Sequence, residues 1–323
     1  MKKIYLILSV FTIVFTACET DFNVNATWEE MTVVYGLLDL GDGKELQQIK
    51  ISKAFLGEMD ALQMAQYADS INFDPNDLDV KIYKVENNII SDSMSLFADT
   101  TIRDGGIFND TIIIYEFLNN NFLNANSEYE LIIKHKESVN VVTSKTNIIS
   151  NFNFDGVYNT VGGNGYMTYP FRFYKITEDE YRSSTITWDD SNDNGKIYQV
   201  DLVINYSEDN IGGGNLVNKQ LVFRQDLVSD KETYLVIEGE SFFNFLRVNI
   251  EKDNTKERQF IGIYLMMTVG SEDLDTYIKV NQPITGIVQE RPYFTNVNNG
   301  IGLFSSRFTK RGAYYYDLED DTK

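Results

Sequence analysis

Apolar residues at every second position are the feature that most constrains what this chain can fold into. In the stretch LDVKIYKV, the apolar Leu78, Val80 and Ile82 are separated by Asp79 and Lys81. A β-strand has this period of two, because successive side chains point to opposite faces of the sheet. Similar runs recur along the chain, and only four prolines interrupt its 323 residues. The pattern predicts an all-β protein.

The strand pattern divides near residue 150, at the polar, Asn-rich passage NIISNFNFDG. Residues 29–150 contain about seven strand-like runs and close with a Tyr-x-Leu strand, which predicts an immunoglobulin-like or fibronectin-like sandwich. Within this unit, residues 59–71 have helical spacing and predict a short helix. Residues 151–323 predict a second β-rich domain, either a sandwich or a partly closed barrel.

The second domain is expected to carry one or two short helices, one of which packs on it. Its apolar residues fall at helical spacing: Phe242, Phe243, Leu246 and Ile250. Ser241 precedes them and is the predicted N-cap. An amphipathic helix of this kind more often closes the open end of a sheet than binds a partner, so we expect it to pack on this domain.

The N-terminus has the layout of a lipoprotein signal peptide over residues 1–17. Two lysines precede the apolar run Ile4–Phe15, which is too short to span a bilayer. Cys18 then follows in the sequence FTAC, which resembles a bacterial lipobox whose cysteine is acylated. We expect Cys18 to carry acyl chains and residues 18–28 to form a lipidated tether.

Charge and cysteine content exclude several classes of protein. The chain has 48 acidic and 28 basic residues, and its net charge is −20 at pH 7. This acidity argues against nucleic acid or anionic lipid head groups as partners. Cys18 is the only cysteine, so the folded part cannot be held by an internal disulfide. It must depend on its apolar core.

The stretch WDDSNDNGKIYQVD contains the spacing D-x-[DN]-x-[DN]-G of a calcium-binding loop. A helix-loop-helix site would also need Asp201 as its last ligand. The flanking sequences STITW and KIYQVDLVINY alternate like strands, so Asp201 lies about 20 Å along an extended chain from Gly195. That distance excludes Asp201 as a ligand, and with it the helix-loop-helix site.

Two interpretations of the acidic stretch remain. Asn194-Gly195 between two alternating runs is typical of a β-hairpin, and we favour this interpretation, with no metal and no other cofactor. The alternative is a calcium ion bound by the close carboxylates and amides of the loop. Its candidate ligands are Asp189, Asp190, Asn192, Asp193 and Asn194.

The sequence contains no obvious catalytic constellation. His135 is the only histidine, and it shares a strand face with Leu131 and Ile133, so we expect it at the end of a core stripe. One histidine and no second cysteine argue against nucleophilic catalysis and transition-metal sites. The acidic runs 178–180 and 272–275 leave open a pair of carboxylates for glycoside hydrolysis. We nevertheless expect no enzymatic activity.

Aromatic clusters provide the candidates for a partner interface. The alternation in YPFRFYKI predicts that Phe171 and Phe173 belong to the core. Tyr314, Tyr315 and Tyr316, near the C-terminus, are the better candidates for contact with another protein.

Four segments resemble a family of Bacteroidota outer-membrane lipoproteins that share a domain of unknown function. They are VVYGLLD, KISKAFLGE, GKIYQVDLVINYSE and GSEDLDTYIKVNQPITGIVQERPYFTNVNNGIGLFSSR. Members are commonly encoded beside TonB-dependent transporters. The resemblance implies no catalytic residues, and it makes Asn194-Gly195 a strand-joining turn. Glu19 and Asp21, directly after Cys18, resemble the surface-export signal of lipoproteins in this phylum.

These observations together predict an outer-membrane lipoprotein, exposed at the cell surface, that acts as a non-enzymatic binding or accessory subunit of a TonB-dependent transporter system. The expected partners are the outer membrane, contacted through the acyl chains of Cys18, and the transporter. The alternatives are a structural component of an envelope assembly and a carbohydrate-active enzyme.

Overall fold

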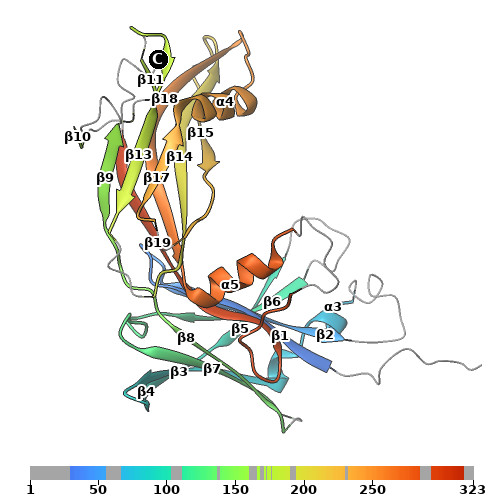
Figure 1. Cartoon of the computed structure of the whole chain (residues 1–323). Helices are drawn as coiled ribbons and strands as arrows, with labels where there is room; N and C mark the ends of the chain where they lie inside the picture. The colour runs from blue at the N-terminus through green and yellow to red at the C-terminus, as the bar shows by residue number, and fades with distance from the viewer. Residues whose placement is uncertain are drawn as a thin grey trace, which may run out of the picture.

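A computed structural model shows a mainly β protein with a few short helices, which confirms the predicted fold class (Figure 1). It describes residues 30–55, 67–102, 111–136, 139–159, 166–167, 171, 173–175, 177–189, 194–229, 232–283 and 292–315. The expected signal peptide, Cys18 and the tether lie outside these residues.

The largest sheet of the described chain contains nine strands and runs through the whole molecule. In spatial order its strands are β15 (Val217–Arg224), β14 (Ile197–Asn210), β18 (Lys256–Gly270), β19 (Ile301–Tyr315), β1 (Glu30–Asp39), β2 (Leu46–Phe55), β6 (Thr111–Leu118) and β5 (Phe97–Ile102). The short strand β16 (Val228–Ser229) also pairs with β14. Each end of this sheet forms one layer of a sandwich.

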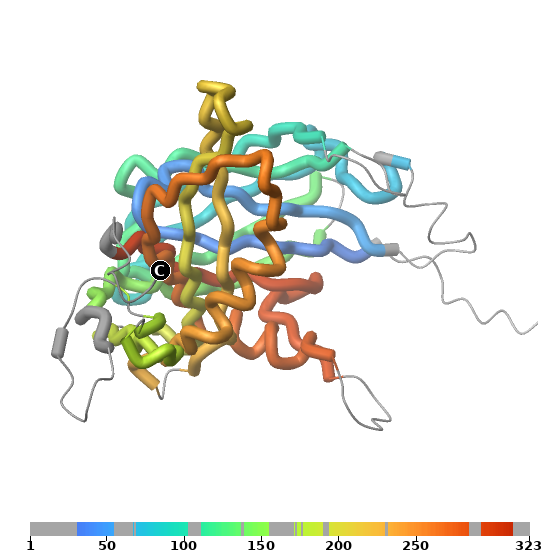
Figure 2. The backbone as a smooth tube through the Cα atoms, turned by 90° about the horizontal axis from the view of Figure 1, so that it is seen from above, coloured from blue at the N-terminus to red at the C-terminus, as the bar shows by residue number. Residues whose placement is uncertain are grey.

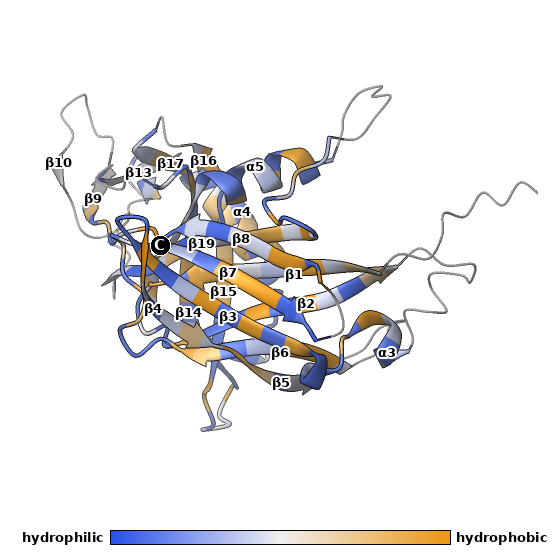
Figure 3. Cartoon of the chain, turned by 90° about the horizontal axis from the view of Figure 1, so that it is seen from below, coloured by the Kyte–Doolittle hydropathy of each residue, from blue (hydrophilic) through white to orange (hydrophobic). Residues whose placement is uncertain are grey.

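The first sandwich has the strand order of an immunoglobulin-type fold. Its second sheet consists of β4 (Ile89–Ser95), β3 (Leu78–Glu86), β7 (Glu128–His135) and β8 (Val141–Asn147). This sheet lies opposite β1, β2, β6 and β5, so sequential strands divide between the layers as they do in immunoglobulin domains (Figure 1). Hydrophobic and hydrophilic bands alternate along β3 and β7, as the sequence predicted (Figure 3).

A tyrosine corner supports this assignment. Tyr129, near the start of β7, is fully buried, and its hydroxyl donates a 3.0 Å hydrogen bond to the carbonyl of Phe122. The same hydroxyl accepts a bond from the backbone N–H of Asn124. A tyrosine at this corner, bonded to backbone a few residues upstream, is characteristic of immunoglobulin-like sandwiches.

The second sandwich is formed at the β14 end of the large sheet, where a smaller sheet provides its other layer. Its smaller sheet consists of β10 (Tyr166–Met167), β9 (Phe154–Asn159), β13 (Ser183–Trp188) and β17 (Tyr234–Glu238). The strands β11 (Tyr174–Lys175) and β12 (Glu180–Tyr181) form a separate short ribbon. Phe171 and Phe173 are fully buried in the core between the layers, which confirms their predicted place.

The predicted helix of the second sandwich is α4 (Gly239–Asn249), and it packs Phe242 into the core. The predicted N-cap was wrong, because α4 begins at Gly239 and Glu238 holds the N-cap position. A Cβ atom on Gly239 would lie 2.0 Å from the carbonyl oxygen of Phe173. The helix therefore starts at a close contact with the backbone of Phe173, two residues before Ser241.

Two further helices lie elsewhere in the described part of the chain. The helix expected over residues 59–71 is represented by α3 (Ala68–Ile71), while residues 59–66 lie outside the described part. A single 3-10 turn, Pro75–Asp77, follows it. The helix α5 (Glu272–Asn281) was not predicted. No helix within the described ranges is long and apolar enough to cross a membrane.

β19 belongs to both sandwiches. Its first residues pair in parallel with β1, from Ile301 beside Val33 to Arg307 beside Asp39. From Arg307 onward it pairs antiparallel with β18. One apolar core is built mainly from residues 34–148 and also takes Phe304 of β19, while the other extends over residues 149–308. β19 thus contributes side chains to both cores, and its backbone is hydrogen-bonded to a strand of each sandwich.

The predicted Asn194-Gly195 hairpin was wrong. β13 pairs with β9 and β17, whereas β14 pairs with β15, β16 and β18, so the two strands lie in different sheets. The segment between them crosses from one layer of the second sandwich to the other. Strand alternation and an Asn-Gly pair indicate a turn, but they do not determine whether the flanking strands pair. The true hairpin of β14 is with β15, and it projects beyond its neighbours (Figure 2).

Candidate functional site

Helix α5 lies in the angle between the two sandwiches, against the large sheet (Figure 1). Its apolar residues Leu274, Tyr277 and Ile278 have the i, i+3, i+4 spacing that places side chains on one helical face. Its N-terminus is anchored at β19, where the Ser271 and Ser305 hydroxyls are hydrogen-bonded at 2.5 Å. An amphipathic helix is therefore held on the face of the sheet that points away from the first core.

A groove runs between α5 and strands β1 and β2, with a volume of about 450 Å³. We call it the α5 groove. Its apolar lining consists of Tyr35, Leu37, Leu46, Leu274, Tyr277, Ile278 and Leu303. Its polar lining includes Asp39, Lys44, Gln48 and Arg307. Apolar walls with a few polar groups are characteristic of binding sites, and the volume lies within their usual range.

Two tyrosines from distant parts of the chain meet at the α5 groove. The Tyr277 and Tyr35 hydroxyls share a 3.2 Å hydrogen bond, and the rings meet edge to face at 6.1 Å. This hydrogen bond, followed by burial, raises the pKa of Tyr35 to about 12. Tyr35 therefore remains neutral at physiological pH, and it is 44% exposed, so its ring is available to a ligand or partner.

The polar lining of the α5 groove includes an ion pair that is part of the fold. Arg307 Nε lies 2.9 Å from Asp39 Oδ2, and the Asp39 side chain is only 4% exposed. The Asp39 carboxylate also accepts hydrogen bonds from the backbone N–H groups of Gly41 and Thr309. The Asp39 carboxylate therefore connects β1 to Arg307 and Thr309 of β19 and has a structural role.

An exposed row of apolar side chains continues from the α5 groove across the sheet. Leu46 on β2 lies directly opposite Leu118 on β6, and the two are 45% and 55% exposed. Phe97 on β5 pairs with Glu116, two residues from Leu118, and is 72% exposed. Diagonal neighbours at this separation are within reach of an aromatic ring. We call Leu46, Leu118 and Phe97 the apolar row.

The apolar row lies on the face of the large sheet opposite to the first core. On β6, Tyr115 and Phe117 are buried in that core, so the alternating position Leu118 points outward. On β2, Ile49 and Ile51 are likewise buried, so Leu46 points outward. Water-facing positions of a sandwich normally carry polar residues, and a run of exposed apolar ones indicates a contact surface.

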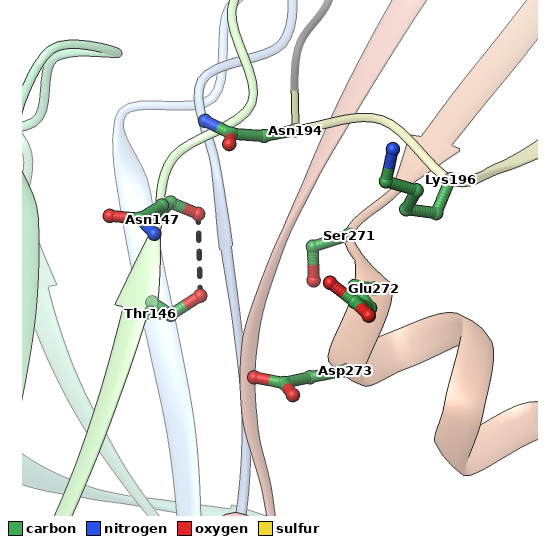
Figure 4. Close-up of a pocket in the computed structure, with 7 residues that line it drawn as sticks. All are labelled: Thr146, Asn147, Asn194, Lys196, Ser271, Glu272 and Asp273. Atoms are coloured by element: carbon green, nitrogen blue, oxygen red, sulfur yellow. Dashed lines mark hydrogen bonds between the residues drawn. The ribbon is translucent and has the colours of Figure 1, made fainter. Parts of the chain in front are cut away.

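A second, polar pocket of about 160 Å³ lies at the start of α5 (Figure 4). Thr146, Asn147 and Asn194 lie on one side of it, and Lys196, Ser271, Glu272 and Asp273 on the other. Asp273 accepts a 2.8 Å hydrogen bond from the side chain of Asn296, which also bonds to the backbone of Phe304. The carboxylate of Asp273 thus supports the last loop before β19.

The described ligand candidates of the acidic loop are used in structural hydrogen bonds. The Asp189 carboxylate accepts from the backbone N–H and the side-chain amide of Asn153. The Asn194 amide donates to the carbonyl of Ile148. Asp190, Asn192 and Asp193 lie outside the described residues. Within the described ranges, no group of three or more His, Cys, Asp or Glu side chains could hold a metal ion.

The position of Asp201 is as predicted, on a strand and away from the loop. Asp201 is 3% exposed in β14, and the Arg224 guanidinium donates two 3.2 Å hydrogen bonds to its carboxylate. His135 ends the stripe of Leu131 and Ile133 on β7, as expected, and its imidazole lies 3.2 Å from the Thr32 hydroxyl.

The two acidic runs form local pairs. Glu178 interacts with Lys175 and Arg182 beside the β11–β12 ribbon, and Asp179 accepts a hydrogen bond from Tyr174. On α5, Asp275 pairs with Lys279 one turn later at 2.5 Å. Each of these carboxylates has a structural partner close by in the sequence.

The C-terminal tyrosines are only partly described. Tyr314 and Tyr315 belong to β19, where their backbones pair with Tyr264 and Ile263 of β18. Their side chains, and the whole of Tyr316, lie outside the described residues. The proposal that they contact a partner therefore stays a prediction.

The α5 groove and the apolar row were not identified from the sequence, although LQQIKIS contains a signal. Gln47 occupies a core-facing position, where its amide bonds both to the N–H and to the carbonyl of Asp39 at 2.9 Å. Leu46 is consequently left on the solvent face.

A scan against protein-family models finds no match, and a comparison with curated proteins finds no similar sequence.

Proposed function

We propose that this protein is a non-enzymatic binding or accessory subunit that docks on another protein through the apolar row and the α5 groove. The observation that carries the proposal is the exposure of Leu46, Leu118 and Phe97 on three neighbouring strands. Contiguous exposed apolar side chains have an unfavourable contact with water, which a partner surface removes. Leu46 belongs both to the groove and to the row, so one protein partner can contact both surfaces.

The charge of the surface supports docking by apolar contact. The chain as a whole carries −20. On the outward positions of β2, β6 and β5, by contrast, the described charged residues are Lys50, Glu116 and Asp99, which nearly balance. Such a surface has little long-range attraction for polyanions or polycations.

The cellular setting of this proposal rests on the N-terminal sequence. The signal-like residues 1–17, the lipobox cysteine Cys18 and the resemblance to Bacteroidota lipoproteins support an outer-membrane lipoprotein exposed at the cell surface. The partner that this resemblance suggests is a TonB-dependent transporter. Replacing Cys18 by alanine should abolish labelling by a fatty-acid analogue and release the protein from the membrane fraction; continued labelling of Cys18→Ala contradicts lipidation.

Co-purification from native membranes tests the docking function. The intact lipoprotein should recover a partner in stoichiometric amount, and Leu118→Ser should reduce the recovery at least about tenfold, the loss that removing a central apolar contact produces. Ile89→Ser is the matched control, because Ile89 is equally apolar, 69% exposed and located on the opposite sheet. Equal recovery with both variants contradicts the proposal. A transporter supports the accessory role, and a membrane-assembly component supports a role in an envelope assembly instead.

A further inference from the structure

We propose that the α5 groove binds a small carboxylate with an apolar chain, of the class of a medium-chain fatty acid, whose anionic group lies near Lys44 and Arg307. This inference goes beyond docking on a protein, because it concerns the hollow of the groove and not the apolar row. It follows from an apolar lining that belongs to neither core, from a net positive charge at one end of the groove, and from the distance between the two ends.

The apolar lining of the α5 groove is separate from both cores. Leu37, Leu274 and Ile278 are each only partly buried, and neither core contains them. Leu303 is 4% exposed and likewise belongs to neither core. These side chains line a volume of about 450 Å³, which is sufficient for a small ligand. An apolar chain in the groove would remove the three partly buried side chains from water, which favours binding.

The charged lining of the groove favours an anion. It consists of Lys44, Arg307 and Asp39, two positive charges and one negative, which leaves a net charge of +1 in a chain that carries −20. Arg307 donates to Asp39 through Nε only, and its side chain is 38% exposed. Among the residues that the structure describes, the terminal nitrogens of Arg307 and the Lys44 ammonium have no hydrogen-bond acceptor. One carboxylate would balance the excess charge and accept from these donors.

The two cations lie at the same end of the groove. The side-chain amide of Gln47 donates to the backbone carbonyls of both Asp39 and Lys44 at 2.9 Å. Lys44 is thereby held next to the residue that pairs with Arg307. An anion at this end can contact both cations, whereas a cation would be repelled by them.

The charged end is separated from an aromatic end along β1. Tyr35 and Asp39 share one face of this strand, and their register partners on β19 are Leu303 and Arg307. Four residues of a strand span about 13 Å, which sets the length of the groove between these two pairs. Tyr277 meets Tyr35 at the end opposite to the charges. A ligand that is extended along β1 would therefore place its anion near Arg307 and its apolar chain towards the tyrosines.

Calorimetric titration with decanoate tests the inference. The protein is the full chain with Cys18→Ala, so that neither its own acyl chains nor detergent compete for the groove. We expect one decanoate to bind per chain. Decyltrimethylammonium, which has the same chain and the opposite charge, and acetate, which has the anion without the chain, should each bind at least about tenfold more weakly. Tyrosine side-chain carbon resonances locate the ligand without any change to the groove, because those of Tyr35 and Tyr277 should shift on titration.

A charge reversal tests the assigned anionic end. Lys44→Glu should weaken decanoate binding at least about fivefold, because it replaces attraction by repulsion. Lys44 is exposed, so the melting temperature of this variant should match that of the unchanged groove. Lys134→Glu is the matched control, since Lys134 is an exposed lysine on β7, in the other sheet of the first sandwich. This control should leave the affinity for decanoate unchanged.

The opposite results overturn the inference. No binding of decanoate excludes the ligand class, and equal binding of decanoate and decyltrimethylammonium excludes recognition of the anion. Equal losses in Lys44→Glu and Lys134→Glu would reduce the effect to the overall charge of the protein. The docking function fails or holds separately, because Leu118 lies outside the groove lining. Leu118→Ser should leave decanoate binding unchanged, whatever it does to the recovery of a membrane partner, and a loss of decanoate binding in this variant would place the ligand on the apolar row instead.

Discussion

Arg307 and Asp39 form a hydrogen-bonded ion pair at the residue where the last strand changes partners. The Arg307 Nε lies 2.9 Å from Asp39 Oδ2, and the same two residues are register neighbours in the parallel β1–β19 ladder. Arg307 is also the register neighbour of Gly270 in β18. One side chain therefore stands at the meeting point of the two sandwiches, close to the α5 groove that lies between them.

We expect Arg307→Met to destabilise the protein by about 2–3 kcal/mol, because it leaves the buried Asp39 carboxylate without its cation. The remaining hydrogen bonds from Gly41 and Thr309 keep the loss below that of a fully isolated buried charge. Urea denaturation measures the change. The exposed pair Lys81–Asp79 is the control, and Lys81→Met should change the free energy of unfolding much less. Equal losses would show that the Arg307 pair is no stronger than a surface pair.

The parallel contact between β1 and β19 depends on a glycine. Gly302 pairs with Val34, has φ +115°, and would place a Cβ 2.0 Å from the Val34 carbonyl oxygen. Gly302→Ala should therefore cost at least about 3 kcal/mol, through backbone strain and the loss of ladder hydrogen bonds. Gly214 has φ +75° with no atom within 4 Å of its Cβ position, so Gly214→Ala should cost only about 1 kcal/mol. A similar loss of stability in both variants would mean that the positive φ alone, and not the close contact with Val34, causes the destabilisation.

Local patterns predicted the strands well and their partners poorly. The alternation in β3 and β7 and the spacing of Phe242 and Leu246 in α4 reflect contact with a core on one side. Such a pattern can be recognised within each short segment alone. The pairing of Val34 with Gly302 joins positions almost the whole described chain apart. No local pattern contains that information, and the same limit explains the mistaken Asn194-Gly195 hairpin.

The candidate site was invisible for a related reason. α5 has its apolar residues Leu274, Tyr277 and Ile278 at helical spacing, but the segment is short and mostly polar, so the signal is weak. Leu46 and Leu118 are ordinary apolar residues in strands, and only the register shows that both point to water. The site is thus a property of strand pairing and could not be assembled from the sequence alone.

Calcium should leave the melting temperature of the protein unchanged. The Asp189 carboxylate is already hydrogen-bonded to the backbone and side chain of Asn153, and Asn194 is bonded to the carbonyl of Ile148. An ion would have to replace these bonds, which reduces its net contribution. The measurement is thermal unfolding with millimolar calcium or with a chelator, supported by calorimetric titration. A rise of several degrees that Asp189→Asn removes would establish a calcium site in this loop.

Tyr277→Phe should lower the pKa of Tyr35 from about 12 towards 10, because the hydroxyl–hydroxyl hydrogen bond with Tyr277 is the largest cause of the shift. Tyrosine side-chain carbon resonances, followed by NMR from pH 8 to 12, report the titration of Tyr35 directly. Tyr264→Phe is a suitable control, since Tyr264 lies in the second sandwich against Arg311 and should not affect Tyr35. An unchanged Tyr35 titration in Tyr277→Phe would mean that burial alone sets its pKa.

Tyr115 should make the stability of the first sandwich fall at high pH. Its hydroxyl is buried without a hydrogen-bond partner among the described residues, and burial raises its pKa to about 12 from a normal value of 10.0. The folded state therefore keeps the proton while the unfolded state loses it, so stability is complete below pH 10 and declines between pH 10 and 12, by up to about 2–3 kcal/mol. Tyr115→Phe removes both the titration and the unpaired hydroxyl. At pH 8 this variant should be as stable as the wild type or about 1 kcal/mol more stable, and its advantage in urea unfolding should widen as the pH rises above 10. A difference between the two proteins that stays constant from pH 8 to 11.5 would show that Tyr115 titrates alike in the folded and unfolded states.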